Sequence, residues 1–430
     1  MRRVLLAVLL VAVVLAVMAP TVTAAPGQLV WSKTAAVADM LSPSGAHVAS
    51  ARTGDVYVAA TADAGATGLD MVLARFTQSG ARKWVRSYHP AHSDILNAVA
   101  CDRDGNVIVC GRSKGTGTYR AVTLKFSRSG KQLWARRITT PIIESDARDV
   151  TADGAGNVYV TGEILRGASG WDWFTAKFSP GGRRLWVRYY SASATVGEYG
   201  AALAFAPNGD LYVAGASGEA SGFDKRDLGL VRYTRSGRLV WTRLRGLVNL
   251  DDEANDLAVG PGGLCVVGEA VDGNRLYGLM WKVGLGGTSW PLDIDGLGGN
   301  PGEGYRHLRA GIDKYARLYA AGTIRSMGSD FFCLSRRTQG GAATFQYIGA
   351  SGSAALALAV SSQGAVYAVG TASRIPGAVL TLGMTPAWTQ SFLGSWGDEM
   401  AAAGDVALTG SHFFVGGWTG NRLLLQKYTR

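Results

Sequence analysis

Runs of alternating apolar and polar residues, separated by short segments rich in Gly, Asp and Asn, extend along most of the chain. The clearest unit lies between Asp146 and Tyr190 and reads DARDVTADGAGNVYVTGEILRGASGWDWFTAKFSPGGRRLWVRYY. Period-two alternation with Val, Tyr, Phe and Trp is typical of β-strands, and Gly, Asp and Asn are typical of the turns between them. The unit therefore predicts four antiparallel strands, at residues 146–152, 157–163, 172–178 and 184–190.

The second strand of this unit recurs eight times along the chain. A Gly, or Ala at Ala60, lies just beyond each copy. The copies are Gly54–Val58, Gly105–Val109, Gly156–Val160, Gly209–Val213, Gly262–Val266, Ala316–Ala320, Gly364–Ala368 and Gly410–Phe414. Four antiparallel strands repeated about every 50 residues are the signature of a propeller blade. The count predicts an all-β, eight-bladed β-propeller of four-stranded antiparallel blades.

The Trp of the fourth strand gives an independent count. It recurs at Trp84, Trp134, Trp186, Trp241, Trp290 and Trp388, and Phe345 takes its place once. The chain ends at the third strand of the last repeat, and the missing copy is Trp31, within residues 28–33. We therefore expect this N-terminal strand to complete the last blade, built from about residues 393–430, and to close the ring. Closure would leave no unpaired edge strand.

Two short motifs characterise the repeat. One is GNVYVTG at residues 156–162; the other is GxxxW at Gly130–Trp134, Gly182–Trp186 and Gly237–Trp241, preceded by Lys or Arg, an aromatic residue and Ser or Thr. Together they resemble the bacterial extracellular β-propeller repeats known as SBBP repeats. The resemblance covers residues 28–430 and is strongest in the first four copies. It implies a secreted propeller and no particular reaction or ligand.

GxxxW is also similar, more weakly, to the docking motif of quinoprotein dehydrogenases. The acidic residue and the Thr-Gly pair that should precede that motif are absent here. We therefore expect no quinone cofactor.

Residues 1–24 have the pattern of a Sec-type signal peptide. Arg2 and Arg3 precede an apolar run from Val4 to Ala19, and Val22 and Ala24 fit cleavage after Ala24. An uncleaved membrane anchor is the alternative, although the run is short for crossing a bilayer. We expect a secreted or cell-surface monomer with a single propeller domain at residues 25–430 and no transmembrane segment in the mature chain.

The distribution of charge indicates which classes of partner to expect. The formal net charge of +11 falls to +9 when Arg2 and Arg3 are removed. Basic residues are spread over the repeats, with Arg86, Arg136, Arg188 and Arg243 following the Trp, and no nucleic-acid-reading motif is present. We expect no nucleic-acid partner. The four arginines that follow the Trp form a basic belt. Such a belt is typical either of a solvated edge or of a surface that attracts anionic extracellular polymers.

Four cysteines are few for a disulfide-based scaffold. Cys101 and Cys110 flank a predicted turn, so both a cross-strand disulfide and two buried thiols are open. Cys265 and Cys333 occupy apolar strand positions and are expected in the core.

Acidic residues recur where the first strand of a blade begins. They include Asp94, Asp146, Glu198, Asp251 and Glu399. If the first strand lines the axis, these carboxylates ring the mouth of the channel, on a face where Trp171 and Trp173 are also expected as stacking surfaces. Such a site would suit a cation or a polyhydroxylated ligand such as a sugar. Because the acids follow the repeat, the alternative is that each one caps backbone N–H groups of a neighbouring blade.

Few residues point to chemistry. His89, His92 and Asp94 lie together in HPAHSD, and imidazole and carboxylate groups are suitable metal ligands. A bound metal cation is compatible with this motif, and no other cofactor is expected. The sequence has no nucleophile elbow, phosphate loop, HExxH or Cys-pair zinc motif. Paired carboxylates for glycoside chemistry depend on separation in space, which the sequence does not give.

Two hypotheses for function follow. The favoured one is a non-catalytic binding or scaffold module for an extracellular or cell-wall polymer or a protein partner. The alternative is an extracellular hydrolase or lyase that acts on a polysaccharide with the acids at the channel mouth.

Overall fold

The computed structural model describes residues 29–36, 41–65, 68–90, 93–115, 117–138, 143–167, 170–192, 197–218, 225–295, 304–326, 328–338, 343–351, 353–361, 365–372, 378–382, 389–393, 401–409, 412–419 and 422–429. Every regular element in these ranges is a β-strand. No helix in them is long and apolar enough to cross a membrane.

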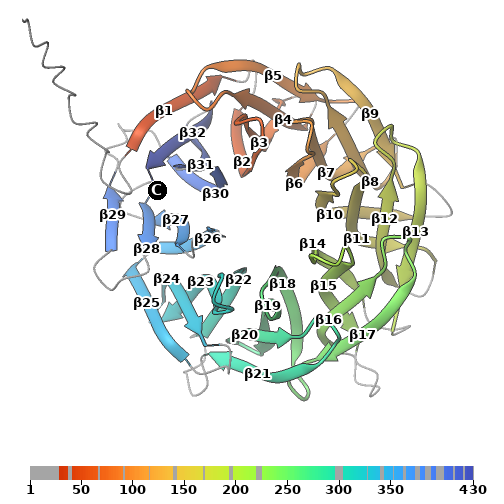
Figure 1. Ribbon diagram of the computed structural model, residues 1–430, viewed down its shortest axis with the longest axis vertical. Coiled ribbons are helices and arrows are strands. Elements are labelled where there is room, and N and C mark those ends of the chain that lie inside the picture. The colour runs from red at the N-terminus through yellow and green to blue at the C-terminus, as the bar shows by residue number, and fades with distance from the viewer. Residues whose placement is uncertain are drawn as a thin grey trace, which may run out of the picture.

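Groups of four consecutive strands are arranged around a central axis, with the first strand of each group innermost (Figure 1). Blade 1 consists of β2 (Leu41–Ser50), β3 (Val56–Asp63), β4 (Leu69–Phe76) and β5 (Arg82–Tyr88). Blade 2 consists of β6 (Asp94–Cys101), β7 (Val107–Lys114), β8 (Tyr119–Phe126) and β9 (Gln132–Arg137). Blade 3 consists of β10 (Glu144–Ala152), β11 (Val158–Leu165), β12 (Trp171–Phe178) and β13 (Arg184–Tyr190). Blade 4 consists of β14 (Tyr199–Phe205), β15 (Leu211–Gly218), β16 (Arg226–Tyr233) and β17 (Leu239–Arg245).

The second half of the ring has the same organisation. Blade 5 consists of β18 (Asp251–Gly260), β19 (Gly263–Asp272), β20 (Arg275–Val283) and β21 (Ser289–Asp295). Blade 6 consists of β22 (Gly304–Ile312), β23 (Leu318–Ser326), β24 (Ser329–Arg337) and β25 (Ala343–Ser351). Blade 7 consists of β26 (Ser353–Val360), β27 (Val366–Ala372), β28 (Ala378–Leu382) and β29 (Thr389–Leu393). Blade 8 consists of β30 (Ala401–Thr409), β31 (His412–Thr419), β32 (Arg422–Thr429) and β1 (Leu29–Ala36).

Strand order confirms the predicted eight-bladed propeller. Within each blade, neighbouring strands pair antiparallel in chain order. Blades 5 and 6 are additionally linked by one parallel bridge between Leu276 and Gly304. In the unit from which the prediction started, the four observed strands begin and end within two residues of the predicted ones.

The N-terminal strand closes the ring, as the sequence predicts. β1 pairs antiparallel with β32, and Trp31 lies opposite Lys427 in the register. The strand extends to Ala36, three residues beyond the predicted end. The two ends of the described chain therefore share one sheet, as the adjacent red and dark blue strands in Figure 1 show.

The Gly that follows each copy of the second-strand motif lies within the observed strand, and a bulge in the innermost strand explains it. In blades 2 to 6, pairing of the first strand with the second skips one residue at the same place. A Cβ at Gly162 would overlap the carbonyl oxygen of Asp146 at this bulge, and Gly111, Gly215, Gly268 and Gly322 meet the equivalent carbonyl. Ala60 is tolerated because the register of β2 differs, skipping from Ser44 to His47 on the opposite strand.

The GxxxW motif joins neighbouring blades rather than forming a site. Each Trp packs on the motif Gly of the next blade, so that a Cβ at Gly182 would lie 2.7 Å from the indole of Trp134. The Arg two positions after the Trp donates a hydrogen bond from Nε to the carbonyl of that same Gly. These pairs are Arg86–Gly130, Arg136–Gly182, Arg188–Gly237 and Arg243–Gly287. Neither interpretation of the basic belt predicted this role, in which each of the four arginines binds the backbone of the next blade.

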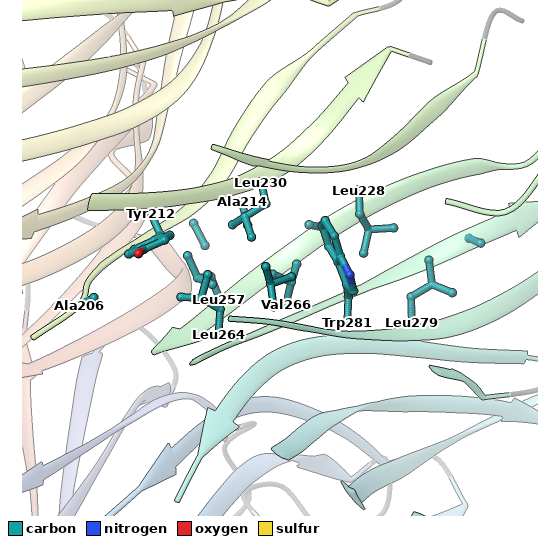
Figure 2. Close-up of a cluster of buried hydrophobic side chains, with 14 of the residues drawn as sticks. Ala206, Tyr212, Ala214, Leu228, Leu230, Leu257, Leu264, Val266, Leu279 and Trp281 are labelled. Atoms are coloured by element: carbon teal, nitrogen blue, oxygen red, sulfur yellow. The ribbon is translucent and has the colours of Figure 1, made fainter. Parts of the chain in front are cut away.

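The hydrophobic core consists of separate clusters between the facing sheets of neighbouring blades. Figure 2 shows the cluster between blades 4 and 5, where Tyr212, Leu228 and Leu230 face Val266 and Trp281. Trp281 and Val266 are fully buried. Because each cluster needs side chains from two blades, a blade cannot bury its apolar face without its neighbours.

All four cysteines are thiols. Cys110 belongs to the cluster between blades 2 and 3, whereas Cys101 packs on the cluster between blades 1 and 2. The two side chains therefore point to opposite faces of one sheet, which excludes the cross-strand disulfide. Cys265 and Cys333 are buried, as predicted.

Candidate functional site

The candidate residues gather at one end of the ring, which we call the entry face. It is the end at which the innermost strands β6, β10, β14 and β18 begin, carrying Asp94, Asp146 and Asp251, with Glu198 just before β14. Figure 1 shows these four strands beside the axis, which is where the first strand of each blade was expected. Glu399 and His92 lie outside the described residues.

Glu198 has a structural role in the seam between blades 3 and 4. Its side chain is fully buried. The carboxylate accepts hydrogen bonds from the backbone N–H groups of Ala192 and Gly218 and from the hydroxyl of Ser217. A carboxylate so surrounded by donors caps backbone groups, as the alternative interpretation of the acids proposed.

Asp251 and its neighbour Asp252 are also engaged within the protein. Arg226 donates to both oxygens of Asp251, at 2.9 Å from Nε and 2.8 Å from Nη2. This guanidinium holds the pKa of Asp251 below its usual value. Asp252 is buried and accepts a hydrogen bond from the N–H of Leu247.

Asp146 contacts the preceding blade. Asn97 donates to its Oδ1 at 2.7 Å, and Nη1 of Arg112 lies 3.6 Å from its Oδ2. Burial raises the pKa of Asp146 to about 6, while the charge of Arg112 opposes the shift. The carboxyl group of Asp146 thus belongs to the seam between blades 2 and 3.

Guanidinium groups pair with acids at the entry face, which the pattern of acids alone did not predict. Arg148 stacks on the ring of Tyr199 at 4.0 Å and pairs with Glu163 at 3.1 Å. Tyr199 donates to Glu253, which Nη1 of Arg226 approaches at 3.4 Å. The acids of this face come in cross-strand pairs, since Glu163 lies opposite Asp146 and Glu269 lies opposite Glu253, and such pairs need nearby cations. Aligning both signs of charge to the repeat, rather than acids alone, would have revealed them.

Two further acids lie deeper along the axis, and each one connects its blade to the next. Asp149 accepts hydrogen bonds from the N–H of Val150 and from the N–H of Leu203 in the next blade. Asp256 makes the equivalent pair with Leu257 and Ala310. Burial raises the pKa of Asp149 to about 7, and hydrogen bonds from the two N–H groups oppose it.

The two candidate tryptophans differ in access. Trp173 is 1% exposed, and its Nε1 donates to Thr161 at 3.0 Å. Its indole also meets Tyr190 edge-on, so no face remains for a ligand and the predicted stacking role is wrong for Trp173. Trp171 is half-buried at the start of β12, at the entry face.

Asp94 differs from the other acids. It is fully buried, and within the described part of the chain neither of its oxygens has a hydrogen-bond partner. His89 lies closer to another acid, with its Nδ1 3.8 Å from Oδ2 of Asp70. Among the described residues, no set of three or more His, Cys, Asp or Glu side chains is arranged to hold a metal ion.

His307 lies in a buried charged cluster between blades 5 and 6. Its Nε2 is 3.1 Å from a carboxylate oxygen of Asp295, which also pairs with Arg337. Burial by itself would lower the pKa of His307, but the Asp295 carboxylate, together with Cys333, raises it to about 9. Although Cys333 is close by, both it and His307 are buried, so the arrangement offers no accessible nucleophile.

Two grooves formed by described residues could admit a ligand. One, of about 140 Å³, lies at the entry face between blades 5 and 6 and is lined by Leu276, Gly304, Arg306, Leu308, Thr323, Arg325 and Asp330. The other, of about 430 Å³, lies at the opposite face, along the first turns of blades 1 to 3, and includes Arg52, Cys101, Asp102, Arg103 and Asp153. Asp102 and Asp153 are held by their own turns, through Asn106 and Asn157.

Comparison with known proteins supports the fold and goes no further. No family model and no curated protein matches the chain. A quinohaemoprotein alcohol dehydrogenase from Pseudomonas putida HK5 is similar over 94% of this chain and 76% of its own, at 13% identity and a TM-score of 0.55. Sqt1 of Chaetomium thermophilum, solved with the N-terminus of ribosomal protein L10, is similar over 91% of this chain and 100% of its own, at 12% identity and a TM-score of 0.55.

Puromycin hydrolase is similar over 87% of this chain, which spans 58% of the hydrolase, at 16% identity and a TM-score of 0.50. At these identities the likeness shows the propeller fold alone. Enzymes and a protein solved in complex with a partner share that fold, so the neighbours do not select one function. Membership of the SBBP repeat family stays a prediction.

Proposed function

We propose that the protein is a secreted, non-catalytic β-propeller that binds an extracellular polymer or protein through its entry face. The observation that carries the proposal is the internal pairing of the candidate acids. Asp146, Glu198 and Asp251 are each held by a guanidinium, an amide or backbone N–H groups of the protein itself. A surface of mutually paired charges suits recognition by many weak contacts.

Acid–base catalysis is disfavoured by the same contacts. Hydrolysis of a glycoside needs two carboxyl groups that reach the substrate, one of them with a raised pKa. Asp251 has a lowered pKa, and Glu198 is buried among donors. The pKa of Asp146 is raised to about 6, but its side chain is 9% exposed and accepts a hydrogen bond from Asn97. Asp94 and Asp70 are at most 3% exposed, so a polymer chain does not reach them.

We place the ligand in the groove between blades 5 and 6, because this groove lies at the entry face. Arg325 and Asp330 form an ion pair at 2.8 Å, with side chains 54% and 38% exposed, so both remain accessible to a ligand. Leu276 and Leu308 supply apolar surface beside them. A groove with donors, acceptors and apolar walls suits a sugar ring, and its volume is well below the roughly 300 Å³ of whole-ligand pockets. It would hold one residue of a longer polymer.

Retention on immobilised cell-wall and plant polysaccharides, measured together with released reducing ends, tests the proposal. We expect retention without release. A variant carrying both Arg325→Ala and Asp330→Ala should bind several-fold more weakly, whereas Arg103→Ala, at the opposite face, should bind like the wild type.

Two results would contradict the proposal. Release of reducing ends that Asp251→Ala abolishes would establish the enzyme alternative. Absence of retention on every polysaccharide and on extracellular protein extracts would remove the binding role.

A further inference from the structure

The seam between blades 1 and 2 contains two buried carboxyl groups that lack the partners found elsewhere. Asp70 in β4 is 3% exposed, and Asp94 at the start of β6 is fully buried. In the described residues, both oxygens of Asp94 and Oδ1 of Asp70 have no hydrogen-bond partner. Burying an ionised carboxylate without donors is strongly unfavourable unless a counter-charge is present.

At the equivalent seams between blades 3 and 4 and between blades 4 and 5, a backbone N–H group donates to the acid. Six residues after the fourth-strand Trp, the N–H of Ala192 donates to Glu198, and the N–H of Leu247 donates to Asp252. At the same position in blade 1 the chain has Pro90, which has no N–H. Asp94 therefore loses the backbone donor that its counterparts use.

Neighbouring side chains replace that donor only in part, because the hydroxyl of Ser113 favours the charged form of Asp94 but also accepts a hydrogen bond from Arg137. Arg137 is close enough to oppose the shift in the pKa of Asp94, but its Nη2 donates to the hydroxyl of Ser113 at 2.8 Å. Burial raises the pKa of Asp94 to about 6, and the charge of Asp70 adds to the shift.

The position of His89 supplies the remaining ligand. Its Nδ1 is 3.8 Å from Oδ2 of Asp70, too far for a hydrogen bond. Two ligand atoms bound to one tetrahedral ion at about 2.1 Å lie roughly 3.4 Å apart, which is close to this separation. As they stand, the three side chains do not form a metal-binding set, and the imidazole, which is 62% exposed, would have to turn toward Asp94 to complete one.

We propose that Asp70, Asp94 and His89 bind one divalent cation of the Zn²⁺ class at this seam. Two carboxylates and one imidazole are a ligand set suited to zinc, and water would fill the fourth position. Ca²⁺ is disfavoured because it takes oxygen ligands alone. The site would join blades 1 and 2 where the backbone cap is absent. It does not depend on the function proposed above.

Calorimetric titration of the EDTA-treated, dialysed protein with ZnCl₂ tests this inference. We expect one Zn²⁺ per chain and a thermal midpoint that rises with Zn²⁺ concentration. Asp94→Asn and His89→Ala should each weaken binding by about tenfold or more. Asp172→Asn is the matched control, because Asp172 occupies the strand position of Asp70 in blade 3 but is paired with Arg166. It should bind zinc like the wild type.

Three outcomes would overturn the inference. One is the absence of saturable zinc uptake, together with a metal-free Asp94→Asn variant more stable than the wild type, because the seam would then simply contain an uncompensated charge. Another is equal zinc affinity of Asp94→Asn and the wild type. The third is tighter binding of CaCl₂ than of ZnCl₂, which would contradict the role of His89.

Discussion

Replacing Gly182 by Ala tests the contact that joins the blades. Gly182 has φ of +81°, and an added Cβ would lie 2.7 Å from Cγ of Trp134, whose indole is 5% exposed. The left-handed backbone costs a non-Gly residue about 1–2 kcal/mol. Overpacking against a buried side chain costs a further 1–3 kcal/mol or so. We therefore expect Gly182→Ala to lower the free energy of unfolding by about 2–5 kcal/mol.

Two further glycines separate these contributions. Gly170 has φ of +87° and nothing within 4 Å of an added Cβ, so Gly170→Ala should show the backbone cost alone. Gly154 also has open space and is not among the positive-φ glycines, so Gly154→Ala should be neutral or stabilising by up to about 1 kcal/mol. The difference between Gly182→Ala and Gly170→Ala isolates the contact with Trp134.

Urea titration followed by tryptophan fluorescence is the appropriate assay. Thermal midpoints of a chain of this size shift by only about 1 °C per kcal/mol, because the entropy of unfolding scales with length. Adding Trp134→Leu to Gly182→Ala should recover part of the loss, since the clash disappears. Equal midpoints for Gly182→Ala and Gly170→Ala, at equal slopes, would refute the account of GxxxW as an inter-blade contact.

The remaining predictions concern closure, pH, thiols and export. Trp31→Ala should cost about 2 kcal/mol in urea titration, because the indole packs on Gly80 and stacks near Phe414, whereas Leu29→Ala, 46% exposed, should cost almost nothing; equal losses would argue against closure through Trp31. The pKa of His307 is raised in the folded state, so its stabilising contribution is present below about pH 6.5 and is lost as pH rises through about 9. The stability difference between the wild type and His307→Gln should therefore shrink, on the order of a few kcal/mol, between pH 6 and pH 10; a constant difference would contradict the ion pair. Unfolded without reductant, the chain should titrate four thiols, whereas two would indicate a disulfide. Mass spectrometry of the exported protein should give a chain beginning at Ala25, and retention of residues 1–24 would favour the membrane anchor.

The fold was accessible from the sequence because blade building is local and repeated. The alternation of residues 157–163 and 172–178 predicted strands that the structure places at β11 and β12. Trp31 predicted closure with β32, because seven internal copies of the fourth strand left the last blade without one and Trp31 supplied it. An error in assigning one strand would have changed the predicted number of blades only if it had recurred in every repeat.

The candidate site was only partly accessible, because its partners come from distant residues. Asp251 is paired with Arg226, 25 residues earlier, and Asp146 contacts Asn97 and Arg112 of the preceding blade. Nothing local to an acid indicates which donor faces it across a seam. The position of Trp173 was misjudged for the same reason, since its cover comes from Gly200 and Gly229 of the next blade.

By itself the sequence determined the strands, the number of blades and the closure of the ring, because periodicity, turn residues and repeat spacing act over a few residues and are copied along the chain. The tertiary structure alone decided which carboxyl groups are satisfied, because that depends on donors brought together across the seams between blades. Glu198 and Asp94 begin equivalent strands, yet one is surrounded by donors and the other is not. The difference arises because the backbone N–H that caps Glu198 is replaced by Pro90 at the seam of Asp94.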